Sequence, residues 1–164
     1  RYTLYLCFGK NFCPSVNISL NKCYSVSGIL CLPFYDASSI ICSLSYSSFA
    51  DNNASGYNCI CFYMTGVIYE MKCCNILRNT QVSLNTEGTI RSDGNLTIED
   101  SCILENNANY IFWAYGTITL SNCTVDSTNH TGSFTIQNTV TKYFIHALNH
   151  MSTQYCHAEY DSVF

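Results

Sequence analysis

The strongest constraint on the fold is a repeat in the middle of the chain. An apolar residue, followed three positions later by an asparagine, recurs at equal intervals along the sequence. The apolar positions are Phe49, Ile76 and Ile103, and the asparagines are Asn52, Asn79 and Asn106. Repeats of about 20 to 30 residues with short apolar segments are typical of solenoids, in which each repeat packs only on its neighbours. The chain is therefore expected to stack copies of one structural unit.

A second pattern identifies that unit as strands. The segments "GNLTIEDSC" from Gly94, "GTITLSNC" from Gly116 and "GSFTIQN" from Gly132 alternate apolar with polar residues. Alternation with a period of two is typical of a strand with one buried face. Helical repeats fit badly with short segments rich in Thr, Ile, Tyr and Phe, and leucine-rich repeats need leucines at closer fixed spacings. We predict an all-β protein, a single-stranded right-handed parallel β-helix with one coil per 22–27 residues.

The recurring asparagines are predicted to have two structural roles. Asn tolerates the left-handed backbone conformation that lets a coil reverse the chain without a clash. In stacked coils, Asn52, Asn79 and Asn106 would also lie above one another, so that their side-chain amides form a hydrogen-bonded ladder. The alternative is that these asparagines merely belong to a polar surface. The equal spacing of both repeated positions favours the ladder.

Cysteine is frequent, with 12 residues in the chain. Cys74, Cys102 and Cys123 fall at nearly equivalent places of successive predicted coils, so we expect them to form a stack inside the solenoid. Neighbouring coils lie about 4.8 Å apart, which is within the range for a disulfide between stacked cysteines. Two interpretations stay open. Oxidised cysteines would indicate an oxidising compartment, whereas free thiols would serve as small apolar core residues.

Composition excludes some partners and favours one compartment. Only 11% of the residues are charged, the net charge is −4 and the seven basic residues are scattered, so we expect no nucleic-acid binding. The most apolar window, residues 27–46, contains Pro33 and Asp36, so no membrane span is predicted in this chain. Five sequons predict a secreted or cell-surface glycoprotein, at Asn17, Asn53, Asn95, Asn122 and Asn129.

The two ends of the chain differ from its middle within what we expect to be a single domain. Residues 1–40 are predicted to form irregular N-terminal coils, and residues 41–140 the coils of the β-helix. Residues 141–164 are predicted to form a helical cap over the open strand edges. Four apolar residues of this cap fall on one helical face: Phe144, Ile145, Leu148 and Met151. Because the chain begins with Arg1 rather than Met, we expect a fragment or a processed product.

No catalytic residue, cofactor or metal is predicted. His146 and His150 lie one helical turn apart and could hold zinc, but a zinc protease would need Glu where Ala147 stands. We prefer to interpret them as polar residues on the outer face of the cap. Glu105 and Asp126, about one coil length apart, could stack on neighbouring coils as the carboxylate pair of a glycosidase. They are the catalytic candidates if the protein is an enzyme.

The segment "YIFWAYG", residues 110–116, offers a candidate binding surface. In a strand, Trp113 and Tyr115 share one face, and Phe112 and Ala114 share the other. Exposed aromatic rings on a flat strand face stack on sugar rings or dock partner proteins. The alternative is a core pair beside ordinary surface aromatics.

These features together resemble a known group of proteins. The Gly-x-Φ-x-Φ…Cys coils, the Phe/Ile-x-x-Asn turns and the ending "TKYFIHALNHMSTQYC" are similar to a large family of uncharacterised Cys- and Asn-rich proteins of trichomonad parasites. This resemblance covers most of residues 45–160. The turn motif alone is also similar to that of polymorphic outer membrane proteins, which are repetitive β-helical surface proteins, although their GGAI motif is absent.

The resemblance implies a parasite surface or secreted β-helix without assigned activity, and it supplies no catalytic residues. We therefore expect a non-catalytic repeat protein for adhesion, host contact or antigenic display. Its expected partner is a host-cell surface protein or a glycan. A carbohydrate-active β-helix, either a polysaccharide lyase or a hydrolase, is the alternative, because a fold alone does not determine a function.

Overall fold

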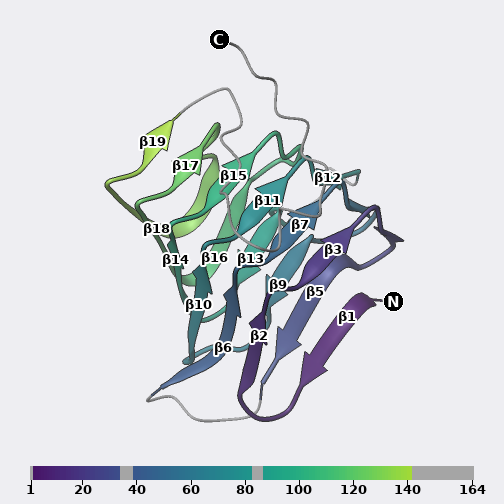
Figure 1. Cartoon of the computed structure of the whole chain (residues 1–164), viewed down its shortest axis with the longest axis horizontal. Helices are drawn as coiled ribbons and strands as arrows, with labels where there is room; N and C mark the ends of the chain where they lie inside the picture. The colour runs from purple at the N-terminus through teal and green to yellow at the C-terminus, as the bar shows by residue number, and fades with distance from the viewer. Residues whose placement is uncertain (1, 34–38, 83–86, 142–164) are drawn as a thin grey trace.

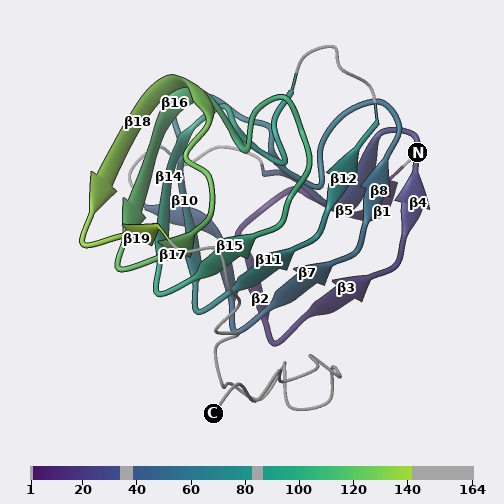
Figure 2. The ribbon, with the colours of Figure 1, turned by 90° about the horizontal axis from the view of Figure 1, so that it is seen from above.

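The computed structural model describes residues 2–33, 39–82 and 87–141, and these residues form strands and turns without a helix. The strands follow one another in stacked coils (Figures 1 and 2). The first coil contains β1 (Tyr2–Cys7), β2 (Asn11–Pro14), β3 (Asn17–Ser19) and β4 (Lys22–Cys23). The second contains β5 (Val26–Leu32), β6 (Ile40–Ser45), β7 (Ser48–Ala50) and β8 (Asn53–Ala54).

The coils become simpler toward the C-terminal end of the solenoid. The third coil contains β9 (Ile60–Phe62), β10 (Ile68–Lys72), β11 (Asn75–Leu77) and β12 (Thr80–Gln81). The fourth contains β13 (Ile90–Ser92), β14 (Asn95–Glu99) and β15 (Cys102–Leu104). The fifth contains β16 (Phe112–Ser121) and β17 (Thr124–Val125), and the sixth contains β18 (His130–Gln137) and β19 (Val140–Thr141).

Each sheet takes its strands from successive coils, and the pairings are parallel. One sheet has the order β19-β17-β15-β11-β7-β3, and a short one has the order β12-β8-β4. The remaining strands form a large sheet in two parts that meet at the long strand β16. One part contains β1, β5, β9 and β13, the other contains β14, β10, β6 and β2, and β18 also pairs with β16. The predicted all-β solenoid of parallel strands is confirmed (Figure 2).

The strand register follows the sequence repeat. Phe49 pairs with Ile76, and Ile76 pairs with Ile103. The segments that begin at Gly94, Gly116 and Gly132 also stack, since Leu96 pairs with Ile118, and Ile118 with Phe134. Equivalent positions are separated by 31, 27, 27, 22 and 16 residues in chain order. The predicted coil length therefore describes the middle coils, while the first step is longer and the last is shorter.

The main core is a stack of apolar side chains inside the coils, and two smaller buried clusters lie outside it. Phe49, Phe62, Tyr69 and Phe112 are fully buried there. The rings of Phe62 and Tyr69 lie 4.7 Å apart, measured between centroids. Because alternate residues of every strand point inward, the same pattern leaves a regular set of side chains on the outer surface.

The two ends depart from the predictions. The N-terminal residues form a first coil of four strands, β1–β4, which pair in parallel with the second coil, with one irregularity in register between Tyr2 and Leu4. Thr141, the first residue of the predicted cap, belongs to β19, which continues the solenoid by pairing with β17. The rest of the predicted cap, including His146 and His150, lies outside the described residues.

We predicted that the repeated asparagines would adopt the left-handed conformation at the turns. In the structure the residues that immediately precede them adopt it instead. Leu20, Asp51, Arg78 and Glu105 have φ angles of 60°, 56°, 52° and 57°. This conformation is costly for a residue with a Cβ atom, so the surrounding structure must hold it. Here the backbone N–H of each of the first three donates to a carbonyl of the next coil, at 3.0–3.1 Å. Stacking therefore fixes the turn, and the asparagine side chain is free to take another role.

Candidate functional site

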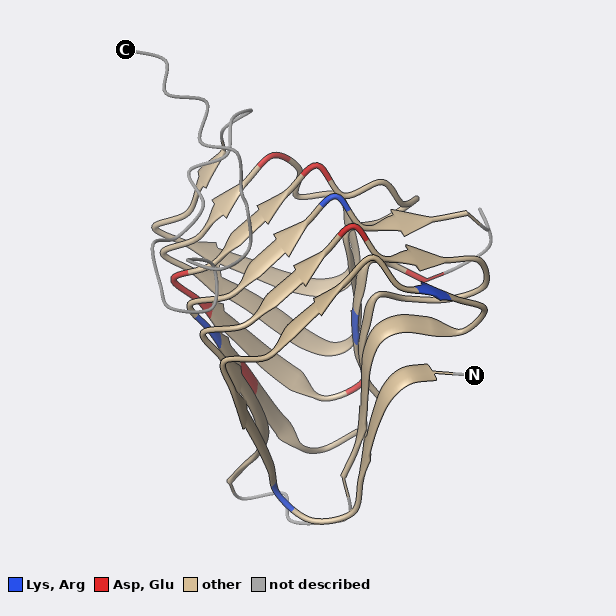
Figure 3. Ribbon diagram, turned by 45° about the vertical axis from the view of Figure 1, so that its right-hand side comes forward, with Lys and Arg blue, Asp and Glu red and all other residues tan. Residues whose placement is uncertain are grey.

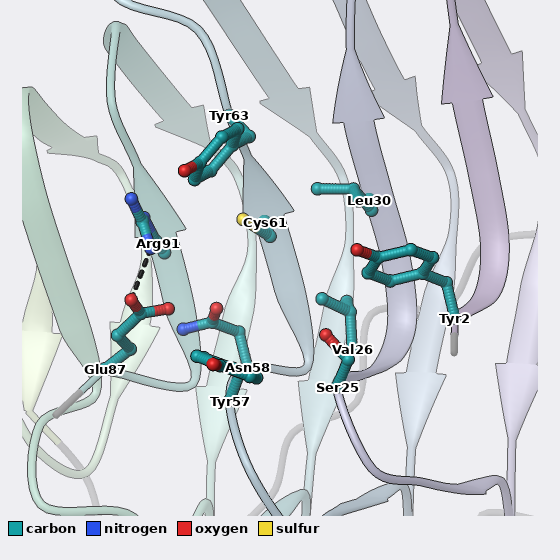
Figure 4. Close-up of a pocket in the computed structure, with 10 residues that line it drawn as sticks. All are labelled: Tyr2, Ser25, Val26, Leu30, Tyr57, Asn58, Cys61, Tyr63, Glu87 and Arg91. Atoms are coloured by element: carbon teal, nitrogen blue, oxygen red, sulfur yellow. Dashed lines mark hydrogen bonds and ion pairs between the residues drawn. The ribbon is translucent and has the colours of Figure 1, made fainter. Parts of the chain in front are cut away.

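A pocket of about 280 Å³ opens on the outer face of the sheet that contains β5, β9 and β13 (Figure 4). The alternation of the strands creates it. On β9, Ile60 and Phe62 point into the core, so Cys61 points outward, and on β13 Arg91 does the same. The other residues that line the pocket include three tyrosines, an acid and an amide: Tyr2, Tyr57, Tyr63, Glu87 and Asn58.

Arg91 is the polar centre of the pocket. Its Nε donates to Oδ1 of Asp93 at 2.8 Å, Nη2 donates to Oδ2 of the same residue at 3.1 Å, and Nη1 pairs with Glu87. Its side chain is only 10% exposed. Burial lowers the pKa of Arg91, but the hydrogen bonds to Asp93 and Glu87 outweigh it and raise the pKa above its ordinary value. The site therefore holds one positive and two negative charges.

Aromatic rings surround this cation on successive coils. The Arg91 guanidinium lies 4.6 Å from the centroid of the Tyr63 ring and 5.2 Å from that of Tyr115. Arg91 is the register partner of Trp113, whose ring lies 6.3 Å from that of Tyr115. Such cation–π contacts hold the aromatic rings in defined positions. We call this surface the aromatic face, formed by Tyr2, Tyr57, Tyr63, Arg91, Trp113 and Tyr115.

The structure places the predicted binding residues on the outside of the solenoid. Trp113 is half-buried and Tyr115 is 64% exposed, whereas Phe112 and Ala114 are buried in the core. The sequence prediction did not add Arg91 to this pair. The repeat in the sequence could have identified it. Arg91 precedes Trp113 by the same number of residues that separates Leu96 from its register partner Ile118, so stacking of the two could have been expected.

Asn58 gives the pocket an unused hydrogen-bond acceptor. The residue is 1% exposed, and its Nδ2 donates to the carbonyl oxygen of Gly88 at 2.7 Å. Its Oδ1 is buried and has no hydrogen-bond partner among the described residues. An unpaired buried acceptor costs about 1–3 kcal/mol. A hydroxyl or amide donor that reached this oxygen would recover that cost. No sequence pattern marked this turn residue.

The carboxylates suggested for a glycosidase lie elsewhere. Asp126 accepts a hydrogen bond from the backbone N–H of Glu105, and neither residue lines the pocket. Glu105 instead stands in the row of left-handed turn residues, in which Arg78 Nε donates to Asp51 Oδ1 at 2.8 Å and Nη2 donates to Oδ2 at 2.9 Å. Charged positions of both signs lie along the stacked turns in Figure 3. The charges of this row thus bind the coils to one another.

The repeated asparagines lie one above another and are hydrogen bonded. Asn52 Nδ2 donates to Asn79 Oδ1, and Asn79 Nδ2 donates to Asn106 Oδ1, both at 3.0 Å. The same Oδ1 atoms also accept from the backbone N–H of Asn52 and Asn79. A fourth member, Asn21, extends the row at 3.1 Å. Asn21 follows Ile18 by three positions, as in the repeat. It was not predicted because 31 residues separate it from Asn52, whereas 27 residues separate the other neighbours in the row.

The predicted cysteine stack is only partly present. Cys74 and Cys123 occupy equivalent positions, where their N–H groups donate to Ser101 and Thr139 on the following coils. Ser101 therefore lies between them. Cys102 belongs to the next position along the strand, because it pairs with Asn75 and Thr124. The unequal spacings of the three cysteines made this shift by one position impossible to see in the sequence. No disulfide joins the cysteines that the structure describes.

Alkaline pH is expected to destabilise the protein through these buried thiols. Burial raises the pKa of Cys74 from 9.0 to about 12. The folded state therefore keeps a proton that the unfolded state loses, so the contribution is complete below pH 9 and is lost as pH rises toward 12. At pH 10.5, in a reducing buffer, this thiol should account for a loss of about 2 kcal/mol. Urea unfolding at pH 8 and pH 10.5 measures it.

The matched comparison uses two single variants. Between these pH values, the free energy of unfolding of Cys74→Ala should fall by about 2 kcal/mol less than that of the wild type, because position 74 then has no thiol to ionise. Cys7→Ser, at an exposed position, should behave like the wild type. Equal pH dependence in all three proteins would contradict the assignment.

Four of the five predicted glycosylation sites are accessible. Asn17, Asn95, Asn122 and Asn129 are exposed, and Asn53 on β8 is half-buried. Glycosylation at these positions stays a prediction. Within the described ranges there is no group of three or more His, Cys, Asp or Glu residues arranged to bind a metal ion, and no helix long and apolar enough to cross a membrane.

No family model, curated protein or solved structure matches the chain. The chemical character of the aromatic face and its pocket is therefore the basis for a functional assignment.

Proposed function

We propose that the protein is a non-catalytic, glycan-binding β-helix that binds a neutral oligosaccharide chain along the aromatic face. The observation that carries this proposal is the set of tyrosines and Trp113 around the ion-paired Arg91, next to the buried, unused Oδ1 of Asn58. Aromatic rings supply stacking surfaces for the apolar faces of sugars. Asn58, Glu87 and the tyrosine hydroxyls supply hydrogen-bond partners for sugar hydroxyl groups.

The shape of the site favours an extended ligand. Its aromatic residues come from different coils: Tyr2 lies on β1, Tyr63 directly follows β9, and Trp113 and Tyr115 lie on β16. Because adjacent coils are about 4.8 Å apart, these rings are distributed along the axis of the solenoid. A chain of sugar rings that runs along this axis can contact several of them at once.

The charge of the site favours a neutral glycan. Both carboxylates, Glu87 and Asp93, are paired with Arg91, so the guanidinium is not free to bind an acidic sugar. The group retains one net negative charge, which repels uronates and sialic acids. This distinguishes the site from one in which an unpaired arginine would bind a carboxylate.

The biological setting of the proposal follows the sequence. A right-handed parallel β-helix at the cell surface or in the secreted fraction, with glycans at its exposed sequons, would present the aromatic face for adhesion or host contact. The partner would be a host-surface glycan or a glycoprotein that carries it.

Binding to immobilised glycans tests the proposal. The wild type should bind a subset of neutral oligosaccharides, and Tyr115→Ala should bind them about tenfold more weakly, since a stacked ring contributes about 0.5–1.5 kcal/mol. Tyr46→Ala is the matched control, because Tyr46 is 49% exposed but lies in the turn after β6, away from the pocket. Equal binding by both variants, or binding only to acidic glycans, would refute the proposed site.

The alternative of a carbohydrate-active enzyme has one supporting observation. Glu87 lines the pocket, and Asp93 lies on the other side of the same guanidinium. A hydrolase would need this pair, rather than Glu105 and Asp126, to act on the sugar. Incubation with a bound oligosaccharide, followed by mass spectrometry, separates the two classes: an unchanged ligand supports binding, and shortened products lost in Glu87→Gln support an enzyme.

A further inference from the structure

Two buried cysteines face each other inside the second coil. Cys31 lies on β5 and Cys42 on β6, the next strand along the chain. Both side chains are fully buried in the core. Their Sγ atoms lie 2.9 Å apart and share a hydrogen bond in which either thiol can be the donor. This pair lies within one coil, unlike the disulfides between coils that the sequence suggested.

The strand pattern explains why both sulfur atoms point inward. On β5, Ile29 and Cys31 are alternate residues on the core face, with Leu30 on the outer face between them. On β6, Cys42 and Leu44 are the corresponding core residues. The two strands belong to the two parts of the large sheet, and their inward side chains meet in the core.

We propose that Cys31 and Cys42 form a disulfide within the second coil when the protein folds in the presence of a small-molecule disulfide such as oxidised glutathione. One cysteine thiolate attacks the glutathione disulfide and releases one glutathione thiolate, which takes up the proton. The second cysteine then attacks the mixed disulfide and releases the second glutathione. The protein loses two electrons and two protons, and the oxidant becomes two molecules of reduced glutathione.

The bond must form before the coil is complete. In the folded protein the pKa of the Cys31 thiol is raised, first by its hydrogen bond with Cys42 and then by burial. A buried, protonated thiol is a poor nucleophile. The same burial protects a disulfide once formed, because a reducing thiolate cannot reach it. Oxidation during folding would therefore fix the second coil, on which the first coil and the third coil both stack.

The neighbouring cysteines do not provide an equivalent pair. Cys74 and Cys123 are separated by Ser101 and lie on alternate coils. Cys61 points outward beside Arg91, away from the core. Cys13 is the nearest competitor, since it is half-buried against the core on β2, the strand that pairs with β6. It therefore serves as the control position in the experiment.

Peptide mapping of the wild type tests the proposal directly. The reduced chain is refolded in a mixture of reduced and oxidised glutathione, quenched in acid, alkylated without reduction and digested with chymotrypsin, which can cleave after Tyr35 between the two cysteines. The expected result is a linked pair of peptides that contain Cys31 and Cys42, lighter by two hydrogen atoms than the separate thiol peptides. Recovery of both cysteines as alkylated thiols from the folded protein would overturn the proposal.

Three variants establish which cysteines are required. Cys31→Ser and Cys42→Ser should each abolish the linked peptides and leave the remaining partner alkylated or joined to glutathione. Cys13→Ser should retain the linked peptides at the wild-type level. A linked pair that persists in Cys42→Ser, or disappears in Cys13→Ser, would assign the bond to other residues and overturn the proposal. If a variant does not fold, the peptide map of the wild type still decides whether Cys31 and Cys42 are linked.

Discussion

Asn79→Ala is expected to lower the free energy of unfolding by about 3–4 kcal/mol, because the side chain lies in the centre of a buried hydrogen-bonded row. Its Oδ1 accepts from the backbone N–H and the Nδ2 of Asn52, and its Nδ2 donates to the carbonyl oxygen of Phe49 at 2.8 Å. Alanine removes these partners from the Asn52 N–H and from the Phe49 carbonyl, while the Asn52 Nδ2 keeps only its bond to the carbonyl oxygen of Ile18. Each unsatisfied group costs about 1–3 kcal/mol, partly reduced by local relaxation. Urea unfolding of the purified protein measures the loss.

Two further asparagine variants calibrate this value. Asn106→Ala should cost about 1–2 kcal/mol, because this end of the row is half-buried and water can replace part of the lost bonding. Asn107→Ala, the adjacent exposed asparagine, should change stability by less than about 0.5 kcal/mol. A loss below about 1 kcal/mol for Asn79→Ala, or equal losses at all three positions, would show that the ladder does not stabilise the coils.

Gly116→Ala is expected to destabilise the protein by about 3 kcal/mol through a backbone clash. A Cβ atom at this position would lie 2.4 Å from the carbonyl oxygen of Gly94 and 2.5 Å from its carbonyl carbon. Both atoms belong to the backbone of the neighbouring coil, so no side-chain rotation relieves the contact. The two coils must move apart, which also disturbs the pairing of Leu96 with Ile118.

Thr119→Ala provides a control on the same strand. Thr119 lies on the outer side of β16, since its neighbours Ile118 and Leu120 are buried in the core. It should cost less than about 1 kcal/mol. Thermal unfolding of both variants beside the wild type measures the difference. A Gly116→Ala protein as stable as Thr119→Ala would contradict the close stacking of these coils.

The all-β solenoid of parallel strands could be predicted from the sequence because stacking imposes a regular spacing. The equal spacing of Ile76 and Asn79 from their counterparts predicts both the strand register and the amide row that the structure contains. The left-handed turns could not be assigned in the same way. They fall on residues as different as Leu20 and Arg78, because the hydrogen bonds of the next coil, and not the residue type, determine that conformation.

The candidate site was less accessible to sequence reasoning. Trp113 and Tyr115 stood out as alternating aromatics within a single strand, and the structure places both on the outside. Arg91, Tyr63 and Asn58 join them from other coils, and only the stacking of those coils brings them together. No repeat in the sequence predicted the pairing of Cys31 with Cys42, because it joins two strands of the same coil.

We propose that a neutral glycan binds along the aromatic face and is not turned over. Trp113 is the only tryptophan in the chain and lies on that face, so its fluorescence reports binding without a label. The most direct measurement is a titration of the wild type and Tyr115→Ala with the neutral oligosaccharide best retained on the immobilised glycans. We predict a saturable change in Trp113 emission, a Kd about tenfold higher in the variant, and an oligosaccharide of unchanged mass. Binding that leaves Trp113 emission unaffected, or that is the same in both proteins, would contradict the account.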